Sequence, residues 1–355
     1  MNTPQRLPAS LTPLDVALAK LLRGIEGVAS GGRASGDIAA CAAAGLGELR
    51  AWPPRDIAAV DGWALRASDL VGASSYTPLP LMKGPVWVEA GDSIPDGSDC
   101  VIDEDALDRT GSMAQVLAEA IPGQGIRRKG GEVADTRTII DAWRPGDLRH
   151  WPRIRVVNTP GGDITAKLIA RSLRAAGVDV VCVEADARDA ASIAKALDIS
   201  ACDLLIAVGG SGVGRTDATV LALAERGEVL AHGFALQPGR TAAVGRIGNK
   251  PVIVMPGAPD QALAVWWTLV LPVLDRLAGA QRKTASRPLA QKIASSVGIA
   301  EIVLLGEQDR AWVPLAVGDL PLTAIARAKA WLVVPGDSEG YAAGTPVNAY
   351  LLELR

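Results

Sequence analysis

The chain has 355 residues, and 49% of them are hydrophobic, so it is long enough for two or three domains with sizeable buried cores. Its 36 basic and 39 acidic residues leave a formal net charge of −3, and the basic run Arg127 to Lys129 has only three residues. These values exclude a disordered chain and argue against nucleic acid as a partner. The amino terminus has no apolar signal segment and no apolar run is long enough to span a bilayer, so we expect a cytoplasmic protein without membrane association.

The cysteines and histidines argue against a zinc site. The four cysteines have no C-x-x-C spacing, and only His150 and His232 could join them as ligands. We expect reduced, buried thiols.

The first element is a helix that the sequence predicts just after residue 12. Thr12 is the expected N-cap, Pro13 the first helical residue and Asp15 the acidic residue of the first turn. From about residue 50 to 149, short apolar runs separated by Pro, Gly and Asp predict a β-rich region with tight turns.

Strands and helices then alternate, which predicts an α/β domain. Because parallel strands need crossover connections, this order indicates an open, mostly parallel sheet with helices on both faces. The expected strands cover residues 153–159, 178–184, 202–209, 241–247 and 251–257, and the expected helices cover residues 163–176, 187–197, 216–225 and 259–277.

The carboxyl-terminal part returns to β-like runs and predicts a small β domain. The sequence thus predicts an α/β multidomain protein with a β-rich N-terminal region at 1–150, an α/β domain at 151–281 and a β-barrel-like domain at 282–355. Trp266 and Trp267 stand side by side in a helical pattern, so both cannot face one core, and we expect packing or dimer-surface roles for them.

The segment LLIAVGGSGVGRTD, residues 204–217, joins a buried strand to a helix through a glycine-rich loop. It differs from a P-loop because Arg215 replaces the lysine, and from the dinucleotide fingerprint because its glycines alternate. A strand that ends in glycines before a helix exposes backbone N–H groups, which bind anions. A tight turn that only needs positive φ angles is the other interpretation.

Three further features favour the anion site. A second strand runs into a turn and helix at residues 252–263, Arg240 precedes a strand, and Arg127 and Arg128 lie between glycines. Ligands of such sheets bind beyond the carboxyl ends of the strands. Together these features predict a ligand with more than one anionic group.

Six segments in chain order carry a resemblance to a known family. They are VDGWAL (60–65), IRRKGGEV (126–133), GGSGVGRTD (209–217), QPGRTAAVG (237–245), MPGAPDQAL (255–263) and AIARAKAWLVVPGDSEGYAAGTPV (324–347). Each is short, but together they span nearly the whole chain. In this order they resemble the motif series of the MoeA/gephyrin E-domain family, the molybdopterin molybdenumtransferases of molybdenum cofactor biosynthesis.

The resemblance implies an elongated homodimer with an N-terminal part of two interleaved subdomains, a molybdopterin-binding α/β domain and a C-terminal β-barrel-like domain. It also implies the reaction, which is Mg²⁺-dependent insertion of molybdate into the dithiolene of adenylylated molybdopterin with release of AMP. An adenylyltransferase or a molybdoenzyme would be a further partner.

The resemblance also implies the roles of individual residues. Asp61 matches an aspartate that reaches the active cleft from the partner subunit, Asp217 matches the aspartate after the glycine loop, and Asp186 is the looser match to an acidic residue near the magnesium ion. Carboxylates suit magnesium that also bridges phosphate oxygens. The implied catalytic residues are Asp61, Asp217 and Arg240, the metal ligands are Asp186 and Asp217, and the cofactor-binding residues are Gly209, Gly210, Ser211, Gly212, Gly214, Thr216, Pro256, Gly257, Arg127 and Arg128. The structural alternatives are a turn role for Asp61, a role as a helix acid near the first turn for Asp217, and a solvated loop position for Asp186.

The sequence departs from the family pattern where the chemistry is expected. The family's K-P-G-K-P is Gln237 to Thr241 here, so one cation is lost and one is changed to Arg240. Losing a cation beside an oxyanion removes a contact worth about 1.5–3 kcal/mol. Ala258 replaces an asparagine, Ala90 replaces a threonine, and the S-T-G-D-E segment becomes residues 158–163, NTPGGD.

These departures leave three functions open. The chain is a divergent transferase that handles molybdate with Arg240, Thr241, Arg127 and Arg128, or it is a molybdopterin-binding carrier or maturation protein that has lost the insertion step. The third is a molybdopterin adenylyltransferase, which would not need the N- and C-terminal regions.

Overall fold

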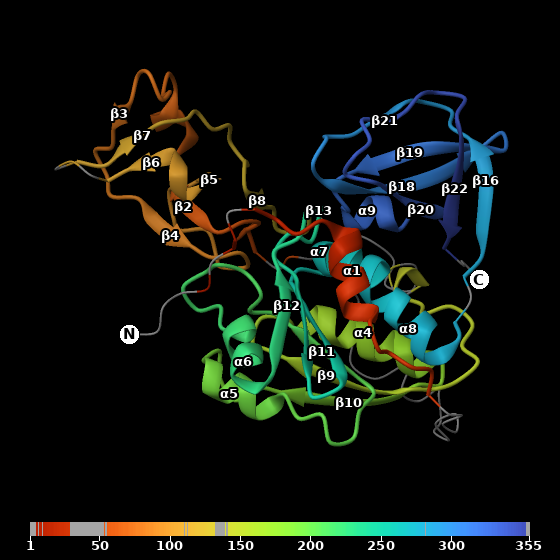
Figure 1. Ribbon diagram of the computed structural model, residues 1–355. Helices are drawn as coiled ribbons and strands as arrows, with labels where there is room; N and C mark the ends of the chain where they lie inside the picture. Colours follow the sequence, from red (N-terminus) through yellow and green to blue (C-terminus); the bar gives the residue numbers. More distant parts are fainter. Residues whose placement is uncertain are drawn as a thin grey trace. The chain divides into compact units, whose positions relative to one another are not determined.

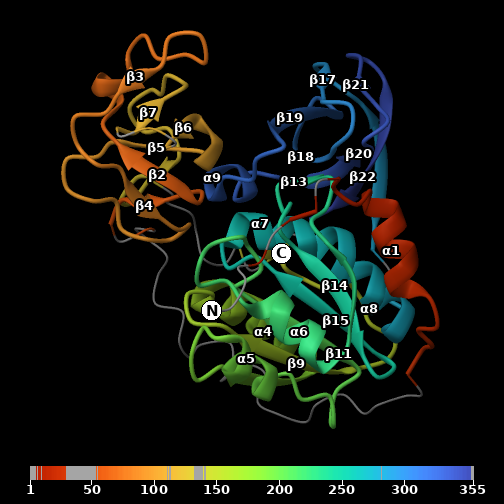
Figure 2. The same ribbon diagram turned by 60° about the vertical axis from the view of Figure 1, so that its left-hand side comes forward.

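The structure is a computed structural model, drawn in Figures 1 and 2, that describes residues 5, 7–8, 10–28, 53, 55–109, 111, 113–131, 139, 141–280 and 282–352. The chain divides into two compact units. The main unit comprises residues 1–48 and 134–355, and the β unit comprises residues 49–133. Each unit is described by itself. The domain boundaries at residues 150 and 281 stay a prediction.

The β unit consists of short antiparallel strands, which confirms the β-rich region expected from its Pro- and Gly-separated apolar runs. Its three small sheets have the strand orders β4-β2-β5, β3-β7-β6 and β1-β8. The strands are β1 (Ile57–Ala58), β2 (Gly62–Leu65), β3 (Leu79–Pro80), β4 (Val86–Val88), β5 (Cys100–Ile102), β6 (Leu107–Asp108), β7 (Gln115–Val116) and β8 (Ile126–Arg127), with 3-10 turns at Ala67–Leu70 and Glu104–Ala106. Trp63, Leu65 and Ile102 lie in its core.

A six-stranded sheet with the order β10-β9-β11-β15-β14-β12 forms the centre of the main unit. The first four of these strands are parallel, whereas β14 pairs antiparallel with both β15 and β12. The strands are β9 (Arg153–Asn158), β10 (Asp179–Glu184), β11 (Leu204–Val208), β12 (Glu228–His232), β14 (Ala243–Ile247) and β15 (Lys250–Met255). Figure 2 shows β9, β11, β15 and β14 side by side. This sheet confirms the expected open, mostly parallel sheet.

Helices cover both faces of this sheet, as its continuous apolar strands require. On one face, α5 (Ala190–Ala196) and α6 (Thr219–Arg226) pack on alternate residues such as Val157, Leu205 and Val254. The intervening residues are also buried, and α4 (Asp163–Ala175) contacts β9, β10 and α7 (Pro259–Val265). α8 (Leu271–Ala278) follows, and α1 (Leu14–Leu22) contacts both α8 and β12.

The first helix begins at Leu14, one residue later than the sequence predicts. Thr12 instead forms a parallel bridge with Phe234, and its N–H donates to the carbonyl of Gly233 (2.9 Å). Pro13 is the N-cap and Leu14 the first helical residue. Pairing with a distant strand segment therefore takes the backbone of Thr12 out of the helix.

Trp266 and Trp267 are both buried, because the chain makes a π-helical turn at Trp266–Val270 between α7 and α8. Trp266 packs against Trp143 with ring centroids 5.7 Å apart, whereas Trp267 stacks on Trp331 at 4.8 Å. The two rings thus face different neighbours inside the chain, and Trp267 joins the central α/β region to the C-terminal sheet.

The C-terminal strands form a sheet with the order β13-β18-β20-β22-β16, to which β19 is added beside β18. The elements are β13 (Leu236–Gln237), β16 (Thr284–Pro288), β17 (Ile293–Ala294), β18 (Ala300–Gln308), β19 (Ala311–Val317), α9 (Leu322–Ile325), β20 (Ala330–Val334), β21 (Gly340–Tyr341) and β22 (Pro346–Leu351). Trp312, Leu305 and Val334 lie in its core. Figure 1 shows the strands β16, β18, β19, β20 and β22 of this sheet in blue.

The thiols are buried only in part. Cys100 and Cys202 are buried as expected, but Cys182, on the edge strand β10, is exposed, and Cys41 lies outside the described residues. No helix within the described ranges is long and apolar enough to cross a membrane.

Candidate functional site

Three loops meet at the carboxyl edge of the central sheet, after β9, β11 and β15. The N–H of Gly209 donates to the carbonyl of Met255 (2.9 Å), and the N–H of Thr159 donates to the carbonyl of Val208 (2.8 Å). The Thr165 hydroxyl on α4 donates to the carbonyl of Gly257 (2.6 Å). A side chain on Gly257 would lie within 3.6 Å of Gly209. The structure therefore brings the two glycine segments predicted from the sequence into contact.

Gly209 and Gly210 make the sharp exit from β11 with φ angles of +90° and +65°. A Cβ on Gly210 would lie 2.4 Å from the hydroxyl oxygen of Thr219. That hydroxyl is buried and donates to the carbonyl of Gly209 (2.8 Å), with the Thr159 hydroxyl 3.3 Å away. These glycines are thus required both by backbone conformation and by close packing.

The carbonyl groups of the glycine loop are held by two side chains from elsewhere in the chain. The amide of Gln5 donates to the carbonyls of Gly210 (3.1 Å) and Gly212 (2.7 Å). The Nε2–H of His232, at the end of β12, donates to the carbonyl of Ser211 (3.0 Å). Burial lowers the pKa of His232, although its backbone hydrogen bonds act in the opposite direction.

The opposite side of the glycine loop keeps N–H groups for a ligand. Among the hydrogen bonds found for the described residues, none is donated by the N–H groups of Ser211, Gly212 or Val213. Gly212 is half-buried and Val213 is exposed, so a ligand can reach these two residues, whereas Ser211 is buried. Successive backbone N–H groups of this kind form an anion-binding nest.

The N-terminus of α6 is not the anion site that the strand-to-helix pattern suggested. Its first N–H groups already have acceptors within the chain: Thr219 donates to Gly210 (3.0 Å), and Val220 and Leu221 donate to the Gln5 side-chain oxygen (2.7 and 3.3 Å). The helix also begins three residues later than expected, at Thr219. Only the N–H groups of the loop itself, ahead of α6, stay as candidate anion donors.

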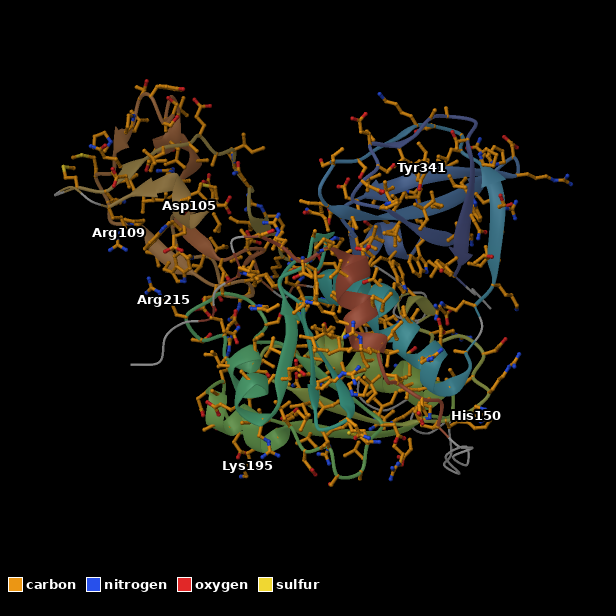
Figure 3. The ribbon with its side chains drawn as sticks, viewed as in Figure 1. Asp105, Arg109, His150, Lys195, Arg215 and Tyr341 are labelled. Atoms are coloured by element: carbon orange, nitrogen blue, oxygen red, sulfur yellow. The ribbon has the colours of Figure 1, made fainter. Side chains whose placement is uncertain are left out.

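Asp217 closes the far end of the glycine loop. One of its oxygens accepts from the N–H of Gly214 (3.1 Å), and the other pairs with Arg188 (3.3 Å), which lies in the segment between β10 and α5. Thr216 and Arg215 are exposed beside it, and Arg215 is labelled in Figure 3. Asp217 thus links the connections that follow β10 and β11.

Asp186 lies at the surface and pairs with Lys195 (3.2 Å), which Figure 3 labels. Both side chains are more than 70% exposed. Among the residues that the structure describes, no three His, Cys, Asp or Glu side chains converge as a metal site would require. The metal roles of Asp186 and Asp217 stay predictions.

Arg240 and Thr241 lie in the turn between β13 and β14, close to the glycine loop. The hydroxyl groups of Thr241 and Ser211 are 3.4 Å apart, and the carbonyl of Arg240 accepts from the N–H of Phe234 (2.8 Å). The Arg240 side chain is exposed, whereas Pro256 is buried at the end of β15. The turn therefore contacts the glycine loop through Thr241, with the exposed cation Arg240 as the preceding residue.

The remaining candidates belong to the β unit and are described there. Asp61 precedes β2 and accepts from the N–H of Ala90 (2.8 Å). Arg127 lies on β8, and Arg128 pairs with Asp56 (2.9 Å). The pKa of Asp56 is held below its usual value by the N–H of Lys129 and then by Arg128.

Sequence reasoning missed the two residues that orient the glycine loop. Gln5 is 205 residues away from Gly210 and lies outside every motif. The sequence presents His232 only as a possible zinc ligand, because it does not predict the strand that carries this residue. A polar residue that binds a loop through distant pairing leaves no signal in a single sequence.

Two family models match the chain. The MoeA N-terminal region (domain I and II) matches residues 34–145, and the probable molybdopterin binding domain matches residues 155–276, from β9 to α8. The glycine loop, Gly257 and Arg240 all fall within the second match.

Several curated relatives are similar over most of the chain. A putative molybdopterin biosynthesis protein of Methanocaldococcus jannaschii is 25% identical over 83% of this chain and 85% of its own length. Molybdopterin molybdenumtransferase 2 of Mycobacterium tuberculosis is 27% identical over 64% of this chain and 70% of its own. The molybdopterin molybdenumtransferase of Haemophilus influenzae is 26% identical over 68% and 71%.

A solved structure shares the fold. The MoeA protein of Pyrococcus horikoshii matches with a TM-score of 0.51 at 22% identity, and the match covers 98% of this chain and all of that chain. A MoeA N-terminal region followed by a pterin-binding α/β domain defines a MoeA-type protein. The chain belongs to the MoeA/gephyrin E-domain family.

Proposed function

We propose that the chain acts in molybdenum cofactor biosynthesis as a molybdopterin molybdenumtransferase. It would insert molybdate into the dithiolene of adenylylated molybdopterin and release AMP. The observation that carries this proposal is the glycine loop, whose N–H groups at residues 211–213 donate no hydrogen bond within the described part of the chain and lie in the region that matches the molybdopterin binding domain. The reaction itself, insertion of molybdate, is the one that the family resemblance implies.

The loop suits the phosphate groups of the pterin substrate. Three successive N–H donors held in place bind phosphate oxygens at low entropic cost, because the loop is already ordered by Gln5 and His232. Arg240 and Thr241 lie beside it and would receive molybdate, where guanidinium gives charge-assisted hydrogen bonds to oxyanions. Only this one cation replaces the two of the family motif.

Asp217 can serve as a single magnesium ligand. Magnesium in phosphate sites commonly uses one or two carboxylates together with substrate oxygens, and Asp217 lies at the end of the phosphate-binding loop. Its Arg188 contact would then have to be exchanged. Bound magnesium would neutralise charge on the phosphates. Asp186, paired with Lys195 at the surface, has no comparable position.

The homodimer belongs to the same proposal. The family resemblance assigns Asp61 to the active cleft of the partner subunit, with Arg127 and Arg128 as further cations. These residues lie in the β unit, and their contribution is a prediction about the dimer. The cytoplasmic location also stays a prediction.

A carrier that binds the pterin without inserting metal is the second candidate. Two positions favour it: Gln237, which stands where the family has lysine, is exposed, and Ala258, the N-cap of α7, makes no capping hydrogen bond where the family has asparagine. Both changes remove polar contacts while leaving the loop intact.

An assay of AMP release separates the two candidates. Purified chain is mixed with adenylylated molybdopterin, magnesium and molybdate, and AMP is measured over time. The transferase releases AMP in proportion to cofactor formed, and Arg240→Gln raises the molybdate KM while the exposed control Arg327→Gln does not. Binding of the pterin nucleotide without AMP release would favour the carrier, and absence of binding would refute both.

A further inference from the structure

Gln5 uses every hydrogen-bonding position of its side chain on the glycine loop and α6. Its amide nitrogen donates to the carbonyls of Gly210 and Gly212, and its oxygen accepts from the N–H groups of Val220 and Leu221. A glutamine amide has two donor hydrogens and two acceptor lone pairs, so all four are satisfied. The side chain is only 4% exposed.

The segment that carries Gln5 is fixed to the main unit on its other side. Leu7 and Pro8 pack against Gly233, where an added Cβ would lie 2.9 and 3.1 Å from their side chains. Thr12 pairs with Phe234 a few residues later. Gln5 therefore reaches the loop from a segment held next to β12, the strand that ends at His232.

Holding the carbonyls determines where the N–H groups point. In a planar trans peptide, the carbonyl of one residue and the N–H of the next point in opposite directions. Gln5 and His232 bind the carbonyls of residues 210, 211 and 212. The N–H groups of residues 211 and 213 therefore point away from Gln5, and the N–H group of residue 212 points away from His232.

We propose that Gln5 is a positioning residue that sets the anion-binding geometry of the glycine loop. It acts through the backbone of Gly210 and Gly212 and touches no substrate. The ligand class is a phosphate ester or anhydride, as in adenylylated molybdopterin, so the proposal rests on the proposed function. It assigns a binding role to the N-terminal segment ahead of α1.

Two substitutions separate positioning of the loop from stability of the helix. In Gln5→Glu, one carboxylate oxygen still accepts from Val220 and Leu221, but the other cannot donate to the loop carbonyls. In Gln5→Met, a neutral side chain of similar length loses both functions. The shared defect is loss of donation to Gly210 and Gly212. Gln291→Glu, at an exposed position of the C-terminal part, has the same change in net charge and is the control.

The experiment measures binding of adenylylated molybdopterin to the full chain by calorimetry, together with the amide chemical shifts of residues 211–213. We expect shifts at these amides in wild type, and about tenfold or weaker binding in both Gln5 variants, from the loss of two hydrogen bonds. Gln5→Glu should melt at a lower temperature than wild type, because its second carboxylate oxygen lies against the two loop carbonyls without a donor, so binding is measured at a temperature where circular dichroism shows the variant folded. Gln291→Glu should bind normally.

The outcomes are distinct for the two proposals. Wild-type binding with unchanged affinity in both Gln5 variants, or without shifts at residues 211–213, overturns the positioning role and leaves the proposed function standing. No binding by wild type overturns the proposed function, and this inference with it. Weaker binding only in Gln5→Glu would show a charge effect and also overturn the positioning role.

Discussion

Gly210→Ala should destabilise the main unit more than a comparable glycine substitution elsewhere. Gly210 has φ +65°, which costs a residue with a Cβ about 1–2 kcal/mol. The new methyl group would also lie 2.4 Å from the Thr219 hydroxyl oxygen. Turning Thr219 away breaks its hydrogen bond to the carbonyl of Gly209 and leaves buried polar groups unpaired, at about 1–3 kcal/mol. The expected loss is about 2–5 kcal/mol in total.

Gly248→Ala is the matched control, because Gly248 has a similar φ of +57° but its nearest neighbour is 3.7 Å away. It should cost only the conformational part, about 1–2 kcal/mol. Equilibrium urea unfolding of wild type and both variants gives the two free-energy differences. Equal losses for Gly210→Ala and Gly248→Ala would refute the packing argument.

A double-mutant cycle tests the same contact directly. Thr219→Ala alone removes a buried hydrogen bond, but in the Gly210→Ala background it also removes the atom that the new methyl group meets. The double variant should therefore lose less than the sum of the two single variants. Additive losses would show that the methyl group and the hydroxyl do not meet.

Three further predictions concern other parts of the chain. Because burial lowers the pKa of His232 below 6.5, the unfolded chain binds its proton more readily, so the free energy of unfolding should fall as pH drops from 6.5 through the lower folded pKa; urea unfolding of wild type beside His232→Gln measures this, and identical pH profiles would contradict it. A thiol reagent followed by peptide mapping should modify exposed Cys182 well before Cys100, whose pKa burial raises to about 11, and reaction at equal rates would contradict the burial of Cys100. If catalysis uses a cleft shared by two subunits, Asp61→Ala and Asp217→Ala should complement each other in a mixed dimer, and a mixed dimer as inactive as each pure variant would count against such a cleft.

The strands of the central sheet and the helices on it could be predicted because burial of their side chains requires a recognisable spacing of apolar residues in the sequence. Strands β11 and β15 are buried on both faces and read as nearly continuous apolar runs, and α4 shows helical spacing of its buried residues. The glycine loop was recognised because the glycines of a strand-to-helix turn stand out in composition. Strand β12 was missed because its burial is only partial.

Other features depend on distant contacts and leave no local pattern. Helix α1 begins one residue later than expected because Thr12 pairs with Phe234. Helix α6 begins three residues later than expected because Asp217 closes a turn with Gly214. The hydrogen bond from Gln5 to the carbonyl of Gly210 joins residues that are 205 positions apart. The π-helical turn that buries Trp266 is likewise invisible to a helical period of 3.6 residues.

The central claim is that the glycine loop binds the pterin substrate of a molybdenumtransferase. Its most direct test is calorimetric titration of the purified chain with adenylylated molybdopterin, followed by addition of magnesium and molybdate and measurement of AMP. The account predicts binding at micromolar concentration, with amide shifts at residues 211–213, and then AMP release. A chain that binds neither molybdopterin nor its adenylate at that concentration would contradict it.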